Sequence, residues 1–264
     1  MIQEISFLQL GFAYLFMVLV LVLSYRTKVG REKEIVIACV RMTVQLIAVG
    51  YLLTLVFAKP NPVVTIIIIG FMGFFAVDNI KKRIRGNISK AFKRIIVLAM
   101  WASSLICLLY FVIIVIGISP WYNPQYFIPV AGMIFGNSMN GIALGATRLI
   151  KGFEEQSARI ETALMLGATP KKAVMPILRD AFDNALMPTI NSMLGMGIVS
   201  LPGMMTGQIL AGNSPLIATR YQIGIMLAIA GSVALASALL VELGYRTFFN
   251  KKGQLQAMSS FEAK

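Results

Sequence analysis

The sequence predicts an all-α, polytopic membrane protein with about seven transmembrane helices in a single domain over residues 1–264. Of these residues 58% are hydrophobic and the mean hydropathy is +0.78, whereas only about half of a soluble domain is apolar. The apolar residues form runs of roughly 18 to 25, the length that a helix needs to cross about 30 Å of hydrocarbon. The spans are expected at 5–25, 35–57, 63–80, 95–117, 126–149, 187–211 and 216–243.

Positive charge divides the segments outside these spans into two groups. The net charge is +13, and 21 of the 24 Lys and Arg residues lie in alternate segments, namely 26–33, 81–94, 148–179 and 246–264. The intervening loops carry only Lys59 and Arg220. Because Lys and Arg gather in cytoplasmic loops, we expect the N-terminus outside and the C-terminus inside. The basic excess is then explained by membrane topology, and anionic lipids at the inner surface would favour it. No nucleic acid partner is expected.

The first span is expected to stay in the mature protein. The stretch from Met1 to Leu23 has no basic region before its apolar run, Glu4 is acidic, and no small-x-small cleavage site follows it. A cleavable signal peptide has the opposite features. We therefore interpret this stretch as a transmembrane helix.

The residue types argue against catalysis within this chain. It contains no histidine, which removes imidazole metal ligands and the commonest general base. Cys39 and Cys107 both fall within spans, where we expect them to pack as small apolar residues. There is no GxxxxGK[ST] sequence to cradle ATP phosphates, no HExxH and no Ser/His/Asp set. We expect no enzyme activity and no cofactor in this chain, and we name no metal ligands.

The segment at about 150–186 is too polar to span a membrane and has the pattern of two short helices. Its apolar and small residues recur at helical spacing, at Phe153, Ile160, Ala163, Leu164 and Gly167. Thr169-Pro170 predicts the start of the second helix, because a hydroxyl caps the helix and proline at the first position loses no hydrogen bond. We expect a tight turn at 167–169 and a kink at Pro176.

This hairpin resembles the cytoplasmic EAA loop of ABC-transporter permeases. Glu161 and Ala163 are followed after three residues by Gly167 and after nine more by Ile177. Thr162 stands where that loop has its second alanine, and Leu178-Arg179-Asp180 stands where it has x-Leu-Pro. The resemblance implies a contact with a separate ATP-binding subunit, and the alternative is an amphipathic loop lying on the membrane. The coupling residues would be Glu161, Ala163, Gly167, Ala168, Thr169 and Pro170.

Spans five and six carry glycines and polar residues that the other spans lack. Small-x3-small patterns, which let helix backbones approach closely, begin at Gly132, Gly141 and Gly203. Asn137 and Asn140 lie near the middle of span five, and amides in hydrocarbon must face protein or a water-filled cavity. They either bond to a neighbouring helix or line a transport pathway.

On span six, Ser200, Met204 and Gln208 share a helix face, and Pro202-Gly203 predicts a broken helix. Interrupted spans in transporters often expose backbone groups to substrate, and the alternative is a proline kink that serves packing. Methionine thioethers favour soft metal ions, although methionine is also a common packing residue. The candidate pathway residues are Asn137, Asn140, Ser200, Met204 and Gln208.

The whole chain resembles the FetB-like (UPF0014) permeases, a bacterial iron-export family with plant relatives associated with aluminium tolerance. The resemblance rests on the hairpin, on Phe135–Gly141 and on Ser200–Ile209. It implies a homodimeric permease in the bacterial inner (plasma) membrane with two copies of a separate subunit that binds ATP and Mg. The implied activity is export of iron or another metal, free or chelated. The alternative is an ATP-independent channel or secondary carrier for a small solute, although the scarcity of mid-span acidic residues disfavours proton coupling.

Overall fold

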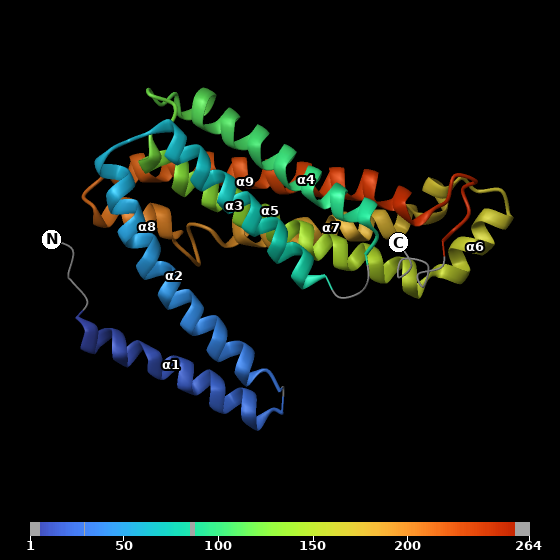
Figure 1. The fold of residues 1–264 in the computed structure, drawn as a ribbon, viewed down its shortest axis with the longest axis horizontal. Helices are drawn as coiled ribbons and strands as arrows, with labels where there is room; N and C mark the ends of the chain where they lie inside the picture. The colour runs from blue at the N-terminus through green and yellow to red at the C-terminus, as the bar shows by residue number, and fades with distance from the viewer. Residues whose placement is uncertain (1–5, 29, 85–87, 257–264) are drawn as a thin grey trace. The chain divides into compact units, whose positions relative to one another are not determined.

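The computed structural model describes residues 6–28, 30–84 and 88–256, and this part of the chain is almost entirely helical (Figure 1). The predicted all-α class is therefore confirmed. Contacts divide the chain into two compact units, one ending at Pro60 and the other beginning at Asn61. The single domain expected over residues 1–264 thus contains two separately packed units.

The first unit is a pair of helices, α1 (Phe7–Arg26) and α2 (Glu32–Ala58), which pack against each other. α1 begins with a capping box: the Ser6 hydroxyl accepts a hydrogen bond from the Gln9 backbone N–H, and the Gln9 side chain accepts one from the Ser6 N–H. Both helices expose most of their apolar side chains. Helices that are apolar on all sides are typical of membrane spans.

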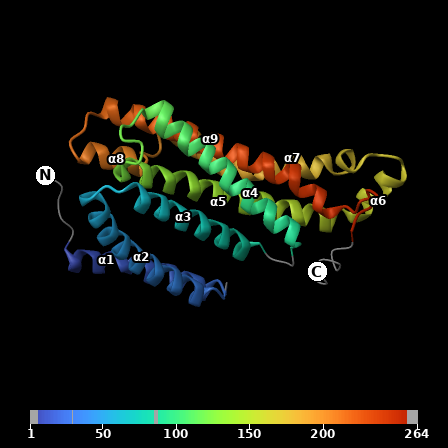
Figure 2. The same cartoon turned by 45° about the horizontal axis from the view of Figure 1, so that its top comes forward.

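The second unit contains the remaining helices, and its long helices begin with a side-chain cap, a proline in the first turn, or both. In chain order they are α3 (Pro62–Arg83), α4 (Lys90–Leu109) with a π-helical continuation (Tyr110–Ile116), α5 (Pro124–Glu155), α6 (Ser157–Met165), α7 (Pro170–Gly195), α8 (Gly203–Leu210), α9 (Pro215–Gly244) and a 3-10 helix (Tyr245–Phe248). Figure 2 shows the long helices of this unit lying side by side.

α5 packs against α3, α4, α7 and α9 and forms the centre of the second unit. A Cβ atom at Gly141 would lie 2.8 Å from Val233 of α9 and 3.3 Å from the Ala185 carbonyl oxygen of α7. One at Gly145 would lie 3.2 Å from the Ala185 side chain. These distances are shorter than ordinary van der Waals contact, so the predicted close approach at this pair of glycines is confirmed. α5 and α9 are also joined at Ser138, whose hydroxyl lies 2.7 Å from that of Ser232.

Six of the described helices are long and apolar enough to cross a membrane, where about seven were predicted. The segment expected as the sixth span, 187–211, is interrupted, because residues 196–202 separate α7 from α8. Gly197 has a φ of +85°, in the left-handed region, and Pro202 has no N–H to donate. The predicted break therefore exists, and it begins several residues before Pro202-Gly203.

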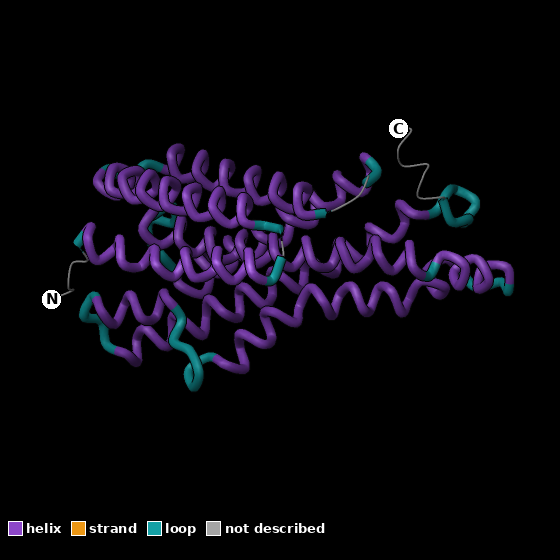
Figure 3. The backbone as a smooth tube through the Cα atoms, turned by 90° about the horizontal axis from the view of Figure 1, so that it is seen from below, coloured by secondary structure: helices purple, strands orange, loops and turns teal. Residues whose placement is uncertain are grey.

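The second helix of the hairpin is also longer than predicted. α7 runs for 26 residues, with Pro176 and Pro188 inside it, so the hairpin helix and the start of the expected sixth span are one element. At the other side of the hairpin, α5 continues to Glu155, beyond the span end expected at residue 149. Figure 3 shows the α6–α7 turn projecting at one end of the second unit.

Candidate functional site

The turn between α6 and α7 is fixed by two hydrogen bonds to carbonyl groups of α6. The Gly167 N–H donates to the Leu164 carbonyl and the Ala168 N–H donates to the Ala163 carbonyl, each at 3.0 Å. This pair of bonds is a Schellman motif, which ends a helix with a residue in the left-handed region. Gly167 has a φ of +84°, which glycine adopts without strain. The predicted turn at 167–169 is therefore confirmed. Glycine is favoured at position 167 because the turn requires a left-handed backbone conformation there.

The start of α7 follows the prediction as well. The Thr169 hydroxyl accepts a hydrogen bond from the Lys172 N–H at 3.4 Å, and Pro170 occupies the first helical position. Beyond this point α7 is held by charge: both carboxylate oxygens of Glu242 on α9 lie 2.8 Å from the Lys171 ammonium. The turn is thus connected directly to α9.

Buried side chains hold the base of the hairpin against α5. Ile160 of α6 and Ile177 of α7 are 1% and 3% exposed, and Gly152 of α5 leaves the space that the Ile177 side chain occupies. The Arg148 guanidinium of α5 donates to the Asp180 carboxylate of α7 at 2.5 Å. The hairpin therefore has a rigid base within the second unit.

The tip of the hairpin presents apolar side chains to the outside. Met165 is 84% exposed and Leu166 is 83% exposed. They lie next to the small residues of the turn, and a Cβ atom at Gly167 would meet nothing within 4 Å. An exposed apolar tip on a fixed base is typical of a protein–protein contact.

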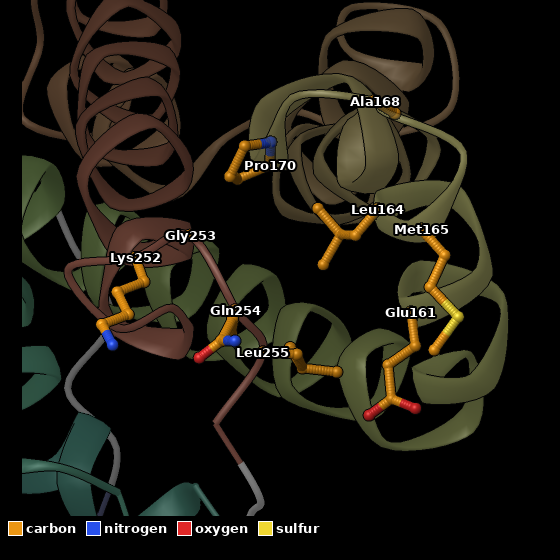
Figure 4. Close-up of a pocket in the computed structure, with 9 residues that line it drawn as sticks. All are labelled: Glu161, Leu164, Met165, Ala168, Pro170, Lys252, Gly253, Gln254 and Leu255. Atoms are coloured by element: carbon orange, nitrogen blue, oxygen red, sulfur yellow. The ribbon is translucent and has the colours of Figure 1, made fainter.

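A cleft of about 670 Å³ separates the hairpin from a turn near the C-terminus (Figure 4). In Figure 4 Leu164 and Leu255 extend toward this space from opposite sides. Three of the predicted coupling residues line it, whereas Gly167 and Thr169 are exposed at the tip and Ala163 is half-buried. The lining residues are Glu161, Leu164, Met165, Ala168, Pro170, Lys252, Gly253, Gln254 and Leu255.

Sequence reasoning did not find the C-terminal wall of this cleft. The wall is a tight turn in which the Asn250 N–H donates to the Gln254 carbonyl and the Gln256 N–H donates to the Phe248 carbonyl, each at 2.9 Å. Phe248 stacks on Phe153 of α5 with ring centroids 4.2 Å apart. The local signal was the turn sequence at Gly253, but its return to the hairpin depends on this long-range aromatic contact.

The predicted pathway residues of α5 lie on a face that is only partly covered. Asn137 is half-buried, and its amide donates to the Met133 carbonyl of its own helix at 2.8 Å. Asn140 is exposed, and its amide oxygen accepts a hydrogen bond from Arg83 of α3 at 2.6 Å. One amide therefore bonds within α5 and the other bonds to a neighbouring helix.

The predicted pathway residues near α8 lie apart from that pair. Ser200 is exposed in the break before α8, Met204 packs against the core, and the Gln208 amide oxygen is buried without a hydrogen-bond partner. α8 packs mainly against α9, and among the described residues no hydrogen bond joins the α8 side chains to Asn137 or Asn140. The glycines of α8 make no close approach either, because a Cβ atom at Gly203 or Gly207 would meet nothing within 4 Å.

Comparison with known proteins links this architecture to one family. The model of the uncharacterised protein family UPF0014 matches residues 7–249. A UPF0014 membrane protein of Synechocystis is 40% identical over 215 residues, covering 81% of this chain and 83% of the relative. The probable iron export permease protein FetB of Escherichia coli is 34% identical over 93% of both chains. The protein ALUMINUM SENSITIVE 3 of Arabidopsis thaliana is 32% identical over 92% of this chain and 88% of the relative. No solved structure matches.

Proposed function

The chain belongs to the UPF0014 family of membrane proteins, and we propose that it is the membrane-spanning permease subunit of an ABC transporter. In this proposal a separate subunit hydrolyses ATP, and two copies of each subunit form an exporter of iron or another metal, free or chelated. The name of the Escherichia coli relative supports the cargo class. The membrane would be the bacterial inner membrane, with the N-terminus outside and the hairpin in the cytoplasm.

The main support for this proposal is the exposed apolar tip of the hairpin. Met165 and Leu166 are largely exposed next to a glycine turn, while Ile160 and Ile177 at the base are buried. A loop that lies on a membrane surface needs no Schellman turn and no ion pairs to the bundle. A rigid, apolar knob with a small-residue backbone is suited to enter a groove on a partner protein.

The cleft beside the hairpin gives the partner a second contact. Glu161 and Lys252 put opposite charges on its two walls, and Leu164 and Leu255 provide apolar surface between them. We infer that a segment of the ATP-binding subunit fills this cleft, so that its apolar side chains meet the two leucines. Charges at the rim would then set orientation and the rate of association more than affinity.

α7 offers a route from this contact to the transport pathway. It is one helix from Pro170 at the hairpin turn to Gly195 at the break before α8. Because packed helices move as rigid bodies, a displacement of the tip by the ATP-binding subunit would be transmitted to residues 196–202. Within the break the N–H groups of Gly197, Val199 and Ser200 bond to nearby carbonyls, and interrupted spans of this kind often face substrate in transporters.

The side chains available along this route suit a weakly held cargo. Among the described residues no group of three or more Cys, Asp or Glu side chains could hold a metal ion. The candidate residues offer amide groups, the Ser200 hydroxyl and the Met204 sulfur. Such a lining fits a chelated metal or a transiently bound ion better than a tightly held bare ion.

The test is co-purification of the chain with the ATP-binding-cassette protein encoded beside it, followed by ATPase assays across a panel of metals and metal chelates. We expect a stable complex whose ATPase activity rises with its cargo, and Gly167→Trp should abolish assembly. Gly212→Trp is the matched control, because Gly212 also has a left-handed φ, +94°, and open space around it, in the α8–α9 turn. Transport by the chain alone, without any ATPase, would contradict the proposal and favour a channel or carrier.

A further inference from the structure

The relative register of α5 and α7 is fixed at their cytoplasmic-side ends. The two helices run in opposite directions, and Arg148 of α5 pairs with Asp180 of α7. Further along, the space at Gly145 is filled by Ala181 and Ala185, because a Cβ atom there would lie 3.3 Å from the Ala181 carbonyl. These contacts define which residues of the two helices lie at the same level.

Counting helical turns from the ion pair predicts that two asparagines lie at one level of the α5–α7 pair. Asn137 lies 11 residues before Arg148, and Asn191 lies 11 residues after Asp180. Eleven residues make about three helical turns and rise about 16 Å, so each asparagine lies on the same helix face as its charged counterpart. Because the helices are antiparallel, both counts run in the same direction from the ion pair. The count therefore predicts that Asn137 and Asn191 share a level and a side of the α5–α7 pair.

Two more asparagines lie between the ion pair and this level. Asn184 is one turn from Asp180, and its amide donates to the Asp180 carbonyl at 2.7 Å. Asn140 is about two turns from Arg148, toward α3, where Arg83 bonds to it. We call Asn137, Asn140, Asn184 and Asn191 the amide seam.

The amide seam is open to the outside of the second unit. Asn140, Asn184 and Asn191 are exposed and Asn137 is half-buried. α5 is long and apolar enough to cross a membrane, and α7 is not among the six helices that meet this criterion. A row of amides at membrane depth is costly against lipid, so water or protein must cover it.

We propose that the amide seam is one wall of a water-filled pathway whose opposite wall is the amide seam of a second copy of this chain. This inference rests on the permease function proposed above and assigns α7, in place of α8, as the partner of the α5 amides. An amide has two N–H donors and an acceptor oxygen, so the groups that are not bonded within the chain can pair with the same groups across a two-fold axis. At the base the charges of Arg148 and Asp180 offset each other, and Arg83, which bonds to Asn140, adds a positive charge on the side of the wall toward α3.

The chemistry of this wall indicates the class of cargo. Amide oxygens bind cations and amide N–H groups bind the oxygens of a chelating ligand, and the four seam side chains are themselves uncharged. A hydrated or chelated metal ion, which shows oxygen atoms on its outside, would pass along such a wall without being held. Without the second copy this site has only one wall.

Cysteine cross-linking in membranes, with the ATP-binding subunit co-expressed, tests the seam. In a background of Cys39→Ala and Cys107→Ala, single cysteines are introduced as Asn137→Cys and Asn191→Cys. Controls are Ile223→Cys and Leu227→Cys, at positions of α9 whose side chains are 56% and 60% exposed. We expect the seam cysteines to react with a water-soluble maleimide and to form cross-linked dimers with a short bismaleimide, and the α9 cysteines to do neither.

The outcomes separate this inference from the proposed function. Seam cysteines that cross-link no more than the α9 controls would overturn the seam, even where the chain still co-purifies with its ATPase. Seam cysteines protected from both reagents would show that another part of the same chain covers them, and would overturn it as well. A functional readout accompanies the labelling: Asn191→Leu should reduce cargo-stimulated ATPase activity severalfold, and Asn191→Gln should restore most of it. Equal activity of the two variants would argue against an amide wall.

Discussion

Arg148 on α5 and Asp180 on α7 form an ion pair, with the guanidinium Nε 2.5 Å from the carboxylate. The pair lies where the hairpin meets the bundle, and Glu155 extends it at 3.9 Å from Arg148. Both side chains are more than a third exposed, so the pair contributes at most about 1 kcal/mol to stability. Its position suggests that it keeps α5 and α7 in register when the hairpin is displaced.

Reversing this pair is the first test. Arg148→Asp alone should leave two carboxylates facing each other and lower the number of cargo molecules exported per ATP hydrolysed. Arg148→Asp combined with Asp180→Arg should recover much of that coupling, because it restores opposite charges. Transport and ATPase rates measured in the same proteoliposomes give the ratio. A ratio that is equally low in the single and double variants would show that the charges do not set the register.

The second prediction concerns Lys252 in the C-terminal wall of the cleft, and the adjacent Lys251 serves as its control. Lys252 lines the cleft and Lys251 does not, although both are exposed. Lys252→Glu should weaken binding of the ATP-binding subunit, mostly by slowing association in a salt-dependent way. Lys251→Glu should bind like the unmodified chain. Association rates from surface-immobilised detergent complexes at two salt concentrations decide this, and identical rates for both variants would remove the turn from the docking surface.

Close packing at the base of the hairpin gives a stability prediction. A methyl group at Gly152 would collide with the Ile177 side chain, so Gly152→Ala should cost about 1–3 kcal/mol. Adding Ile177→Ala removes the colliding atoms, so the double variant should be less destabilised than the two single effects predict together. Gly70→Ala on α3 is the control, because nothing lies within 4 Å of its Cβ position. The melting temperatures of both glycine variants are measured in detergent. Equal melting temperatures for Gly152→Ala and Gly70→Ala would contradict close packing between Gly152 and Ile177.

The membrane orientation can be checked with two lysine positions. Lys59 follows α2 and Lys90 begins α4, and both are exposed. In the cysteine-free background, Lys59→Cys should react with an impermeant maleimide added to intact cells, and Lys90→Cys should react only after lysis. This follows from the gathering of positive charge in cytoplasmic loops. The reverse pattern would invert the orientation and place the hairpin outside, where no ATP-binding subunit could reach it.

Local sequence signals predicted local structure well. Gly167 ends one helix and Thr169-Pro170 begins the next, and both effects depend only on residues close in the sequence. The turn that they predict is present. The small residues at Gly141 and Gly145 also predicted close packing, because only close packing favours a row of glycines in a membrane helix. The break near Pro202 was also predicted from a local signal, because proline has no N–H to donate to a helix.

The features that depend on distant contacts were not predicted. The residues of α7 were assigned to two elements, a hairpin helix and a transmembrane span. The polar start of α7 indicated a loop outside the membrane, and its more apolar end indicated a segment within it. Asn184 and Asn191 were overlooked for that reason, since the helix to which both belong was not recognised. The C-terminal turn was missed because its position depends on the stacking of Phe248 on Phe153, almost a hundred residues away in the sequence.

Asn137 separates a transport role from a structural one. Its amide bonds only to the Met133 carbonyl of its own helix among the described residues, and one hydrogen bond in a membrane contributes about 0.6 kcal/mol on average. Asn137→Leu should therefore change cargo-stimulated ATPase activity severalfold while the melting temperature stays nearly constant. Ser138→Ala is the matched neighbour, because Ser138 is fully buried against Ser232 of α9.

For Ser138→Ala we expect the opposite result, a lower melting temperature with unchanged activity per folded dimer. The two residues are adjacent in sequence and differ in the direction they face, so the comparison isolates that direction. Both quantities should be measured on the same purified complex, since expression level alone would confuse them. If Asn137→Leu lowered stability and left activity per dimer intact, Asn137 would be a packing residue and the pathway would have to lie elsewhere.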